Sequence, residues 1–93
     1  MGAFAVELAP RAAHDLEGLS SDVSRRIETR LLELEEHPFP RGDTIKRLQG
    51  TDPAAYRFRV GDYRAIFRIL GRVVRILRVV HRSDLERAIQ DLV

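Results

Sequence analysis

The sequence contains no cysteine, which excludes disulfide bonds, a thiolate nucleophile and any metal site built on sulfur ligands. It also has no apolar run approaching the ~20 residues that span a bilayer, so no membrane association is expected. The N-terminal segment has no basic cluster and already includes Glu7, which does not indicate a secretory signal. These absences together predict a protein of the reducing cytoplasm.

Histidine is scarce, and the sequence shows no repeat, low-complexity tract or linker. The three histidines are too scattered for metal-ligand spacing, so we expect neither a metal nor a small-molecule cofactor. The 93 residues, 44% of them hydrophobic, are enough for one folded unit. We therefore expect a single domain over residues 1–93.

Charge is unevenly distributed along the chain, although the net charge is only +2. Residues 1–40 carry a net charge of −4 and residues 83–93 a net charge of −2. Residues 41–82, by contrast, contain 11 basic and 3 acidic residues. A concentrated basic segment is typical of a phosphate-binding surface, but a solvated basic face has the same composition.

The N-terminal part of the chain predicts one strand followed by a helical hairpin. Alternation over residues 4–8 is typical of a short strand, and Pro10 suits the first turn of a following helix. Either Ser20 or Ser21 can cap a second helix, in which apolar residues recur at helical spacing. Pro38 ends this helix, because the residue before a proline avoids helical backbone angles.

The C-terminal part of the chain predicts an antiparallel sheet. Residues 38–55 contain three of the four prolines and indicate a loop with at most a short turn over residues 45–48. Three strand-like runs follow, at residues 56–60, 63–70 and 73–81. Ser83 can cap a short final helix. The predicted fold class is α+β in the order β-α-α-β-β-β-α, a mostly antiparallel sheet with the helical hairpin packed on one face.

The pair Gly61-Asp62 is a two-residue turn signal that sets the register of the first hairpin. Counting back from this turn places Arg59 opposite Arg64, on the face away from the apolar side chains. Like charges in such a pair destabilise a sheet, and the nearest acids, Asp52 and Asp62, fall in a loop and in the turn. A bound anion would remove the repulsion, because arginine donates two parallel hydrogen bonds to phosphate oxygens. The hairpin therefore predicts a phosphate-binding face, with a solvated surface as the alternative.

The register of the last strand stays open. A two-residue loop at Gly71-Arg72 places His81 on the face of Arg59 and Arg64. A three-residue loop places Arg82 there instead, because a slip of one residue exchanges the two faces of a strand.

Three segments resemble the RelE/ParE superfamily, whose members are the toxins of type II toxin-antitoxin systems: Leu48-Gln49-Gly50, Tyr56–Phe67 and Val79–Leu85. The predicted order of strands and helices also matches along nearly the whole chain. The resemblance is closer to the RelE branch and implies a ribosome-dependent endoribonuclease that cuts mRNA by attack of a 2′-hydroxyl on the adjacent phosphate. It also implies that the partners are a cognate antitoxin, the ribosome and mRNA.

The resemblance places the active surface on the hairpin arginines and on the arginine after the last strand, here Arg57, Arg59, Arg64 and Arg82. We add His81 to this catalytic set, because it is the only nearby group with an ordinary pKa near neutrality. Glu86 stands where many members have a tyrosine and is a second candidate acid or base. Further RNA-binding residues are predicted in the same basic segment: Lys46, Arg47, Arg68 and Arg78.

Two departures from the family pattern favour alternative functions. The C-terminal tyrosine of many ribonuclease members is absent, and arginine stands at positions 57 and 59 where some members have lysine. One alternative is a gyrase-inhibiting toxin of the same superfamily. Another is an attenuated, non-catalytic member that binds only its antitoxin.

Overall fold

A computed structural model describes residues 2–92. These residues form five strands, three α-helices and two short 3₁₀ helices, with the following bounds: β1 (Ala5–Leu8), α1 (Pro10–Glu17), α2 (Ser21–Leu31), a 3₁₀ helix (Leu32–Glu35), β2 (Ile45–Arg47), β3 (Tyr56–Val60), β4 (Tyr63–Leu70), β5 (Val73–His81), a 3₁₀ helix (Arg82–Asp84) and α3 (Leu85–Gln90). None of the described helices is long and apolar enough to cross a membrane.

The strands form one sheet in the order β1-β5-β4-β3-β2. Strand β1 is parallel to β5, and all other neighbours are antiparallel. The predicted α+β class, with a mostly antiparallel sheet, is therefore confirmed. One strand was missed: residues 45–47, predicted as loop or turn, pair with β3 at the edge of the sheet. Three residues are too few to show an alternating pattern, and only the pairing of Ile45 with Phe58 reveals the strand.

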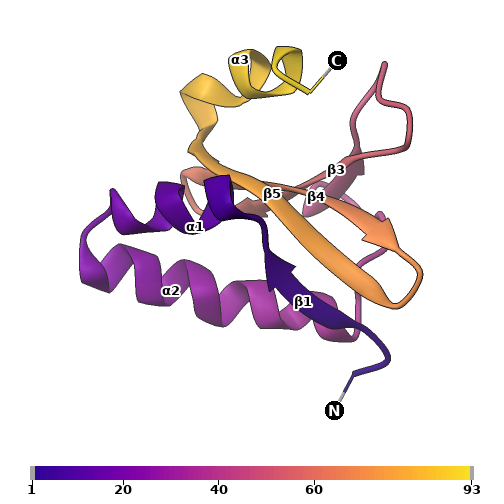
Figure 1. The fold of residues 1–93 in the computed structure, drawn as a ribbon, viewed down its shortest axis with the longest axis horizontal. Helices are drawn as coiled ribbons and strands as arrows, with labels where there is room; N and C mark the ends of the chain where they lie inside the picture. The colour runs from indigo at the N-terminus through magenta and orange to yellow at the C-terminus, as the bar shows by residue number, and fades with distance from the viewer. Residues whose placement is uncertain (1, 93) are drawn as a thin grey trace.

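Helices α1 and α2 pack against one face of the sheet and α3 lies on the other, as Figure 1 shows. The main core lies under the helical hairpin and includes Leu16, Ile27, Leu34, Phe58, Phe67 and Ile76, all at most 3% exposed. The six hairpin residues predicted to share the apolar face all belong to this core or pack against it: Tyr56, Phe58, Val60, Tyr63, Ala65 and Phe67.

A second, smaller apolar cluster lies beneath α3 on the opposite face of the sheet. Ile66 and Val80 come from the sheet, Ala88 comes from α3, and Leu48 and Ala55 come from the segment that leads into β3. Because this cluster is small, the face of the sheet beneath α3 is only partly apolar. Most of the other side chains on this face are arginines.

The ends of the helices differ in detail from the predictions. Ser20, one of the two predicted candidates, caps α2. The α-helix ends at Leu31 and tightens into a 3₁₀ turn, well before Pro38. Ser83 does not cap the last helix, so that prediction is wrong. Its backbone N–H donates a hydrogen bond to Nδ1 of His81, which caps the 3₁₀ turn before α3.

The register between β4 and β5 contains a bulge that the sequence did not reveal. The connecting loop has two residues, because Leu70 pairs with Val73. Ile66 pairs with Arg78 but Phe67 pairs with Ile76, so the register shifts by one residue between them.

This shift decides which side chains share a face at the far end of the hairpin. Beyond the bulge, Arg64 is opposite Val80 and Tyr63 is opposite His81. The loop therefore has two residues, as in the first predicted alternative. The side chain that shares the face of Arg64 is nevertheless that of Arg82, as in the second alternative. Strand alternation places His81 on the face of Tyr63 and carries Arg82 towards the face of Arg64.

Candidate phosphate-binding site

The basic residues gather on one face of the sheet through cross-strand pairing. The predicted pairing of Arg59 with Arg64 is confirmed, and two further like-charge pairs lie on the same face. The three pairs are Lys46 with Arg57, Arg59 with Arg64, and Arg68 with Arg75. Each opposes sheet formation unless an anion lies nearby.

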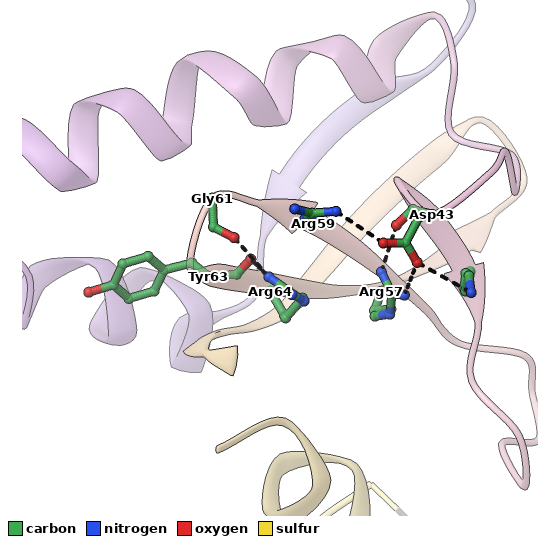
Figure 2. A network of polar contacts seen from close by, with 7 residues as sticks. Asp43, Arg57, Arg59, Gly61, Tyr63 and Arg64 are labelled. Atoms are coloured by element: carbon green, nitrogen blue, oxygen red, sulfur yellow. Dashed lines mark hydrogen bonds and ion pairs between the residues drawn. The ribbon is translucent and has the colours of Figure 1, made fainter. Parts of the chain in front are cut away.

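Asp43 supplies a carboxylate on this face, as Figure 2 shows. Nη2 of Arg57 donates to its Oδ1 at 3.2 Å, and Nη1 of Arg59 donates to its Oδ2 at 3.0 Å. Nζ of Lys46 lies 3.3 Å from Oδ1. The sequence analysis missed this residue, because it precedes Arg57 by 14 positions and only the pairing of β2 with β3 brings the two together.

A tight turn holds Asp43 in place. The backbone N–H of Arg41 donates to the carbonyl of Ile45 at 3.0 Å, and Gly42 within this turn has a φ of +49°, which favours glycine. The backbone carbonyl of Asp43 also accepts a hydrogen bond from Nη1 of Arg57 at 3.0 Å. Hydrogen bonds from Lys46 and then Arg57 hold the pKa of the Asp43 carboxyl below its ordinary value.

The guanidinium of Arg64 donates to backbone carbonyls rather than to a carboxylate. Its Nη1 lies 3.0 Å from the Gly61 oxygen and 2.9 Å from the Tyr63 oxygen (Figure 2). Burial lowers the pKa of Arg64, and repulsion from Arg57, Arg59 and Arg82 lowers it further, in that order. Four cationic groups therefore lie near one another, and the field at Arg64 favours a bound anion.

Arg82 lies at the edge of this cluster, beside the β3–β4 turn. Its backbone N–H donates to the Asp62 carbonyl at 2.7 Å, while its Nε lies 3.9 Å from Asp62 Oδ1. The side chain is 65% exposed. The backbone of Arg82 is therefore fixed beside the turn, while its side chain is accessible to a ligand. The cluster formed by Arg57, Arg59, Arg64 and Arg82 is called the arginine cluster below.

His81 lies on the other face of the hairpin. Its ring packs edge-on against Tyr63, with 5.6 Å between ring centroids, and its Nδ1 lies 2.8 Å from Oγ of Ser83. It lines a polar cleft of about 390 Å³ together with residues from α1 and α3, including Asp15 and Arg87. The structure therefore separates His81 from Arg64, which lies on the opposite face.

Arg78, predicted to bind RNA, is engaged in an internal ion pair. Its Nε and Nη2 donate to the two carboxylate oxygens of Asp15 at 2.8 and 3.2 Å, and the side chain is only 17% exposed. A hydrogen bond from the backbone of Val79 to Asp15 completes this contact between α1 and β5. The hydrogen bonds to Asp15 raise the pKa of Arg78. We therefore assign Arg78 a structural role.

The remaining predicted residues are scattered. Arg47 pairs with Tyr56 at the end of β2, so it does not share the face of Lys46. Arg68 donates to the carbonyl of Pro53 at 3.2 Å. Glu86 lies exposed in the first turn of α3. Among residues 2–92, no three His, Asp or Glu side chains come together as a metal site.

The sheet order, with the helical hairpin on one face and α3 on the other, is that of a RelE-like fold. The family described as ParE toxin of type II toxin-antitoxin systems matches residues 6–86. The chain therefore belongs to this family of toxins within the RelE/ParE superfamily, as the resemblance predicted.

Solved structures from both branches of the superfamily are similar to this chain. The RelBE2 complex of Mycobacterium tuberculosis contains a chain 27% identical, covering 86% of this chain and 99% of that one, with a TM-score of 0.73. The RelE–RelB complex of Pyrococcus horikoshii gives 29% identity, coverage of 87% and 97%, and a TM-score of 0.70. A ParDE system of Pseudomonas aeruginosa, at 14% identity and with coverage of 85% and 96%, shares the fold with a TM-score of 0.59. A search of curated protein sequences finds no match.

Proposed function

We propose that this toxin is a ribosome-dependent mRNA endoribonuclease that inhibits translation in the cytoplasm. The observation that carries the proposal is Arg64, a guanidinium surrounded by three other cations and bonded only to backbone carbonyls. Such an arrangement binds a phosphodiester strongly, because planar guanidinium groups match phosphate oxygens in pairs. The arginine cluster would hold the scissile phosphate.

In the proposed reaction, the RNA 2′-oxygen forms a bond to the adjacent phosphorus while the bond from phosphorus to the 5′-oxygen breaks. Negative charge grows on the phosphorane oxygens, where preorganised guanidinium groups stabilise it. Arginine is a poor base, since its guanidinium group stays protonated at neutral pH. Asp43 is the nearest carboxylate to the cluster, but its lowered pKa makes it a weak base at neutral pH. The group that takes the 2′-hydroxyl proton and the group that protonates the leaving 5′-oxygen would then both come from the ribosomal complex, which would make cleavage dependent on the ribosome.

His81 and Arg82, which are adjacent at the end of β5, should contribute unequally to the rate of cleavage. We expect Arg82→Ala to slow single-turnover cleavage about 10²-fold, because it removes a charge from the arginine cluster. We expect His81→Gln to change this rate little, because the β-bulge places His81 on the other face. Rates measured on ribosomes with saturating toxin test this order. A larger loss for His81→Gln would return His81 to the chemistry, as the sequence predicted.

A cognate antitoxin is the second partner that we propose. The similar chains of M. tuberculosis and P. horikoshii were solved as complexes with their antitoxins. An antitoxin that covers the arginine cluster would supply further anionic groups to this face, and it would thereby prevent access of RNA.

One experiment tests the proposed function. Purified toxin is added to a translation reaction and the mRNA 5′ ends are mapped, while gyrase supercoiling is assayed in parallel. Cuts in phase with codons support the ribonuclease. Uncut mRNA would contradict it, whatever the gyrase result.

Gyrase inhibition is the second candidate, and two observations favour it. The matching family is the ParE toxin family, and the β-bulge keeps His81 away from the arginine cluster. Inhibited supercoiling with intact mRNA would support this candidate. Inactivity in both assays would instead support an attenuated member that binds only its antitoxin.

A further inference from the structure

Asp43 joins the arginine face from the turn before β2, outside the strands of the sheet. Both of its carboxylate oxygens are used: Oδ1 by Arg57 and Lys46, and Oδ2 by Arg59. The side chain is nevertheless 61% exposed and belongs to neither apolar cluster. Exposed ion pairs add little to stability, so core packing does not explain why a carboxylate stands here.

The carboxylate of Asp43 has the geometry of a bound phosphate. Arg57 and Arg59 point from the same face of β3 and each donates to a different oxygen, much as guanidinium groups divide the oxygens of a phosphodiester (Figure 2). Lys46, directly opposite Arg57 on β2, adds a third positive charge. The three cations therefore form an anion site next to Arg64, and Asp43 occupies it.

We infer that Asp43 is an internal placeholder for a backbone phosphate of RNA, displaced when RNA binds. The inference rests on the proposed function and deepens it: the free toxin orders its own cations, and the substrate takes the place of the carboxylate. Arg57 keeps one anchor when this happens, because its Nη1 also donates to the Asp43 backbone carbonyl. With only 15% of its side chain exposed, Arg57 stays in position for the incoming phosphate.

Displacement has a measurable electrostatic consequence. A displaced Asp43 regains a counterion from solution, so the wild-type toxin releases about one ion fewer per bound RNA than a toxin without this carboxylate. The slope of log affinity against log salt counts the ions exchanged on binding, so this difference of about one ion appears in the slope. Removing the carboxylate should therefore strengthen RNA binding and steepen its salt dependence together.

The test compares Asp43→Asn with Glu28→Gln, which removes the same charge from the exposed surface of α2, on the opposite side of the sheet. Binding of a fluorescent single-stranded RNA dodecamer is measured by anisotropy between 50 and 200 mM KCl. We expect Asp43→Asn to bind severalfold more tightly, with a slope steeper by about 1, and Glu28→Gln to resemble wild type. Equal gains in both variants would overturn the inference, while leaving RNA binding and the proposed function intact.

A second measurement uses the unaltered toxin and does not depend on how the variant folds. The ¹³C resonance of the Asp43 carboxyl is followed during titration with inorganic phosphate and with the same RNA. Displacement should move this resonance and raise the pKa of Asp43 towards its ordinary value, because the hydrogen bonds from Lys46 and Arg57 are lost. A resonance unchanged at saturating RNA would overturn the inference. A shift with inorganic phosphate but no binding of RNA would overturn both the RNA placeholder and the proposed function, and would leave only an anion site at Asp43.

Discussion

Replacing Arg64 with alanine should abolish growth arrest on induced expression and slow RNA cleavage by about 10²–10³-fold. The guanidinium lies in the middle of the arginine cluster, where the repulsion of three neighbours already disfavours its charge. The negative charge on the reacting phosphate is greatest in the phosphorane, which this guanidinium would contact. The loss of the guanidinium should therefore lower kcat more than it weakens RNA binding. The measurements are growth after induction and single-turnover cleavage on ribosomes.

Arg25→Ala is the matched control for this substitution. Arg25 is an exposed residue of α2, so its removal changes the net charge equally but on the other side of the sheet. Both variants should keep the fold, because the side chain of Arg64 bonds only to carbonyls beside the β3–β4 turn. Undiminished toxicity of Arg64→Ala at an equal protein level would remove Arg64 from the site.

Replacing Asp15 with alanine should lower the free energy of unfolding by about 3 kcal/mol. The carboxylate is 15% exposed and accepts three hydrogen bonds, two from Arg78 and one from the backbone N–H of Val79. Its loss leaves a largely buried cation and a backbone donor without their partner. Urea unfolding followed by circular dichroism measures the change.

Two further variants separate the causes of this effect. Glu17→Ala removes an exposed carboxylate from the same helix and should change stability by less than about 0.5 kcal/mol. Asp15→Asn keeps an acceptor for Val79 and should cost less than Asp15→Ala. A loss for Asp15→Ala no larger than that for Glu17→Ala would show that the ion pair does not hold α1 against β5.

Local signals explain which parts of the fold could be predicted. The turn at Gly61-Asp62 joins its strands through two residues, so the pairing of Arg59 with Arg64 followed from counting alone. The helical spacing of apolar residues predicted the helical hairpin of α1 and α2 in the same way. The edge strand β2 was invisible, because three residues carry no period and their partner strand begins nine residues later.

The features of the candidate site likewise fall into those that local sequence predicted and those that it did not. The sequence by itself determined that arginines would meet on one face of the first hairpin, since a short turn leaves only one register there. Only the tertiary structure decided three other features. A bulge separates His81 from Arg64, and Arg78 forms an ion pair with Asp15. Asp43 accepts hydrogen bonds from both Arg57 and Arg59. The last two of these depend on contacts between segments distant in the chain, whereas the bulge changes the register within a hairpin whose loop has two residues. The energy of such a contact depends on the neighbours that folding brings together, and it leaves no periodic pattern in the residues themselves.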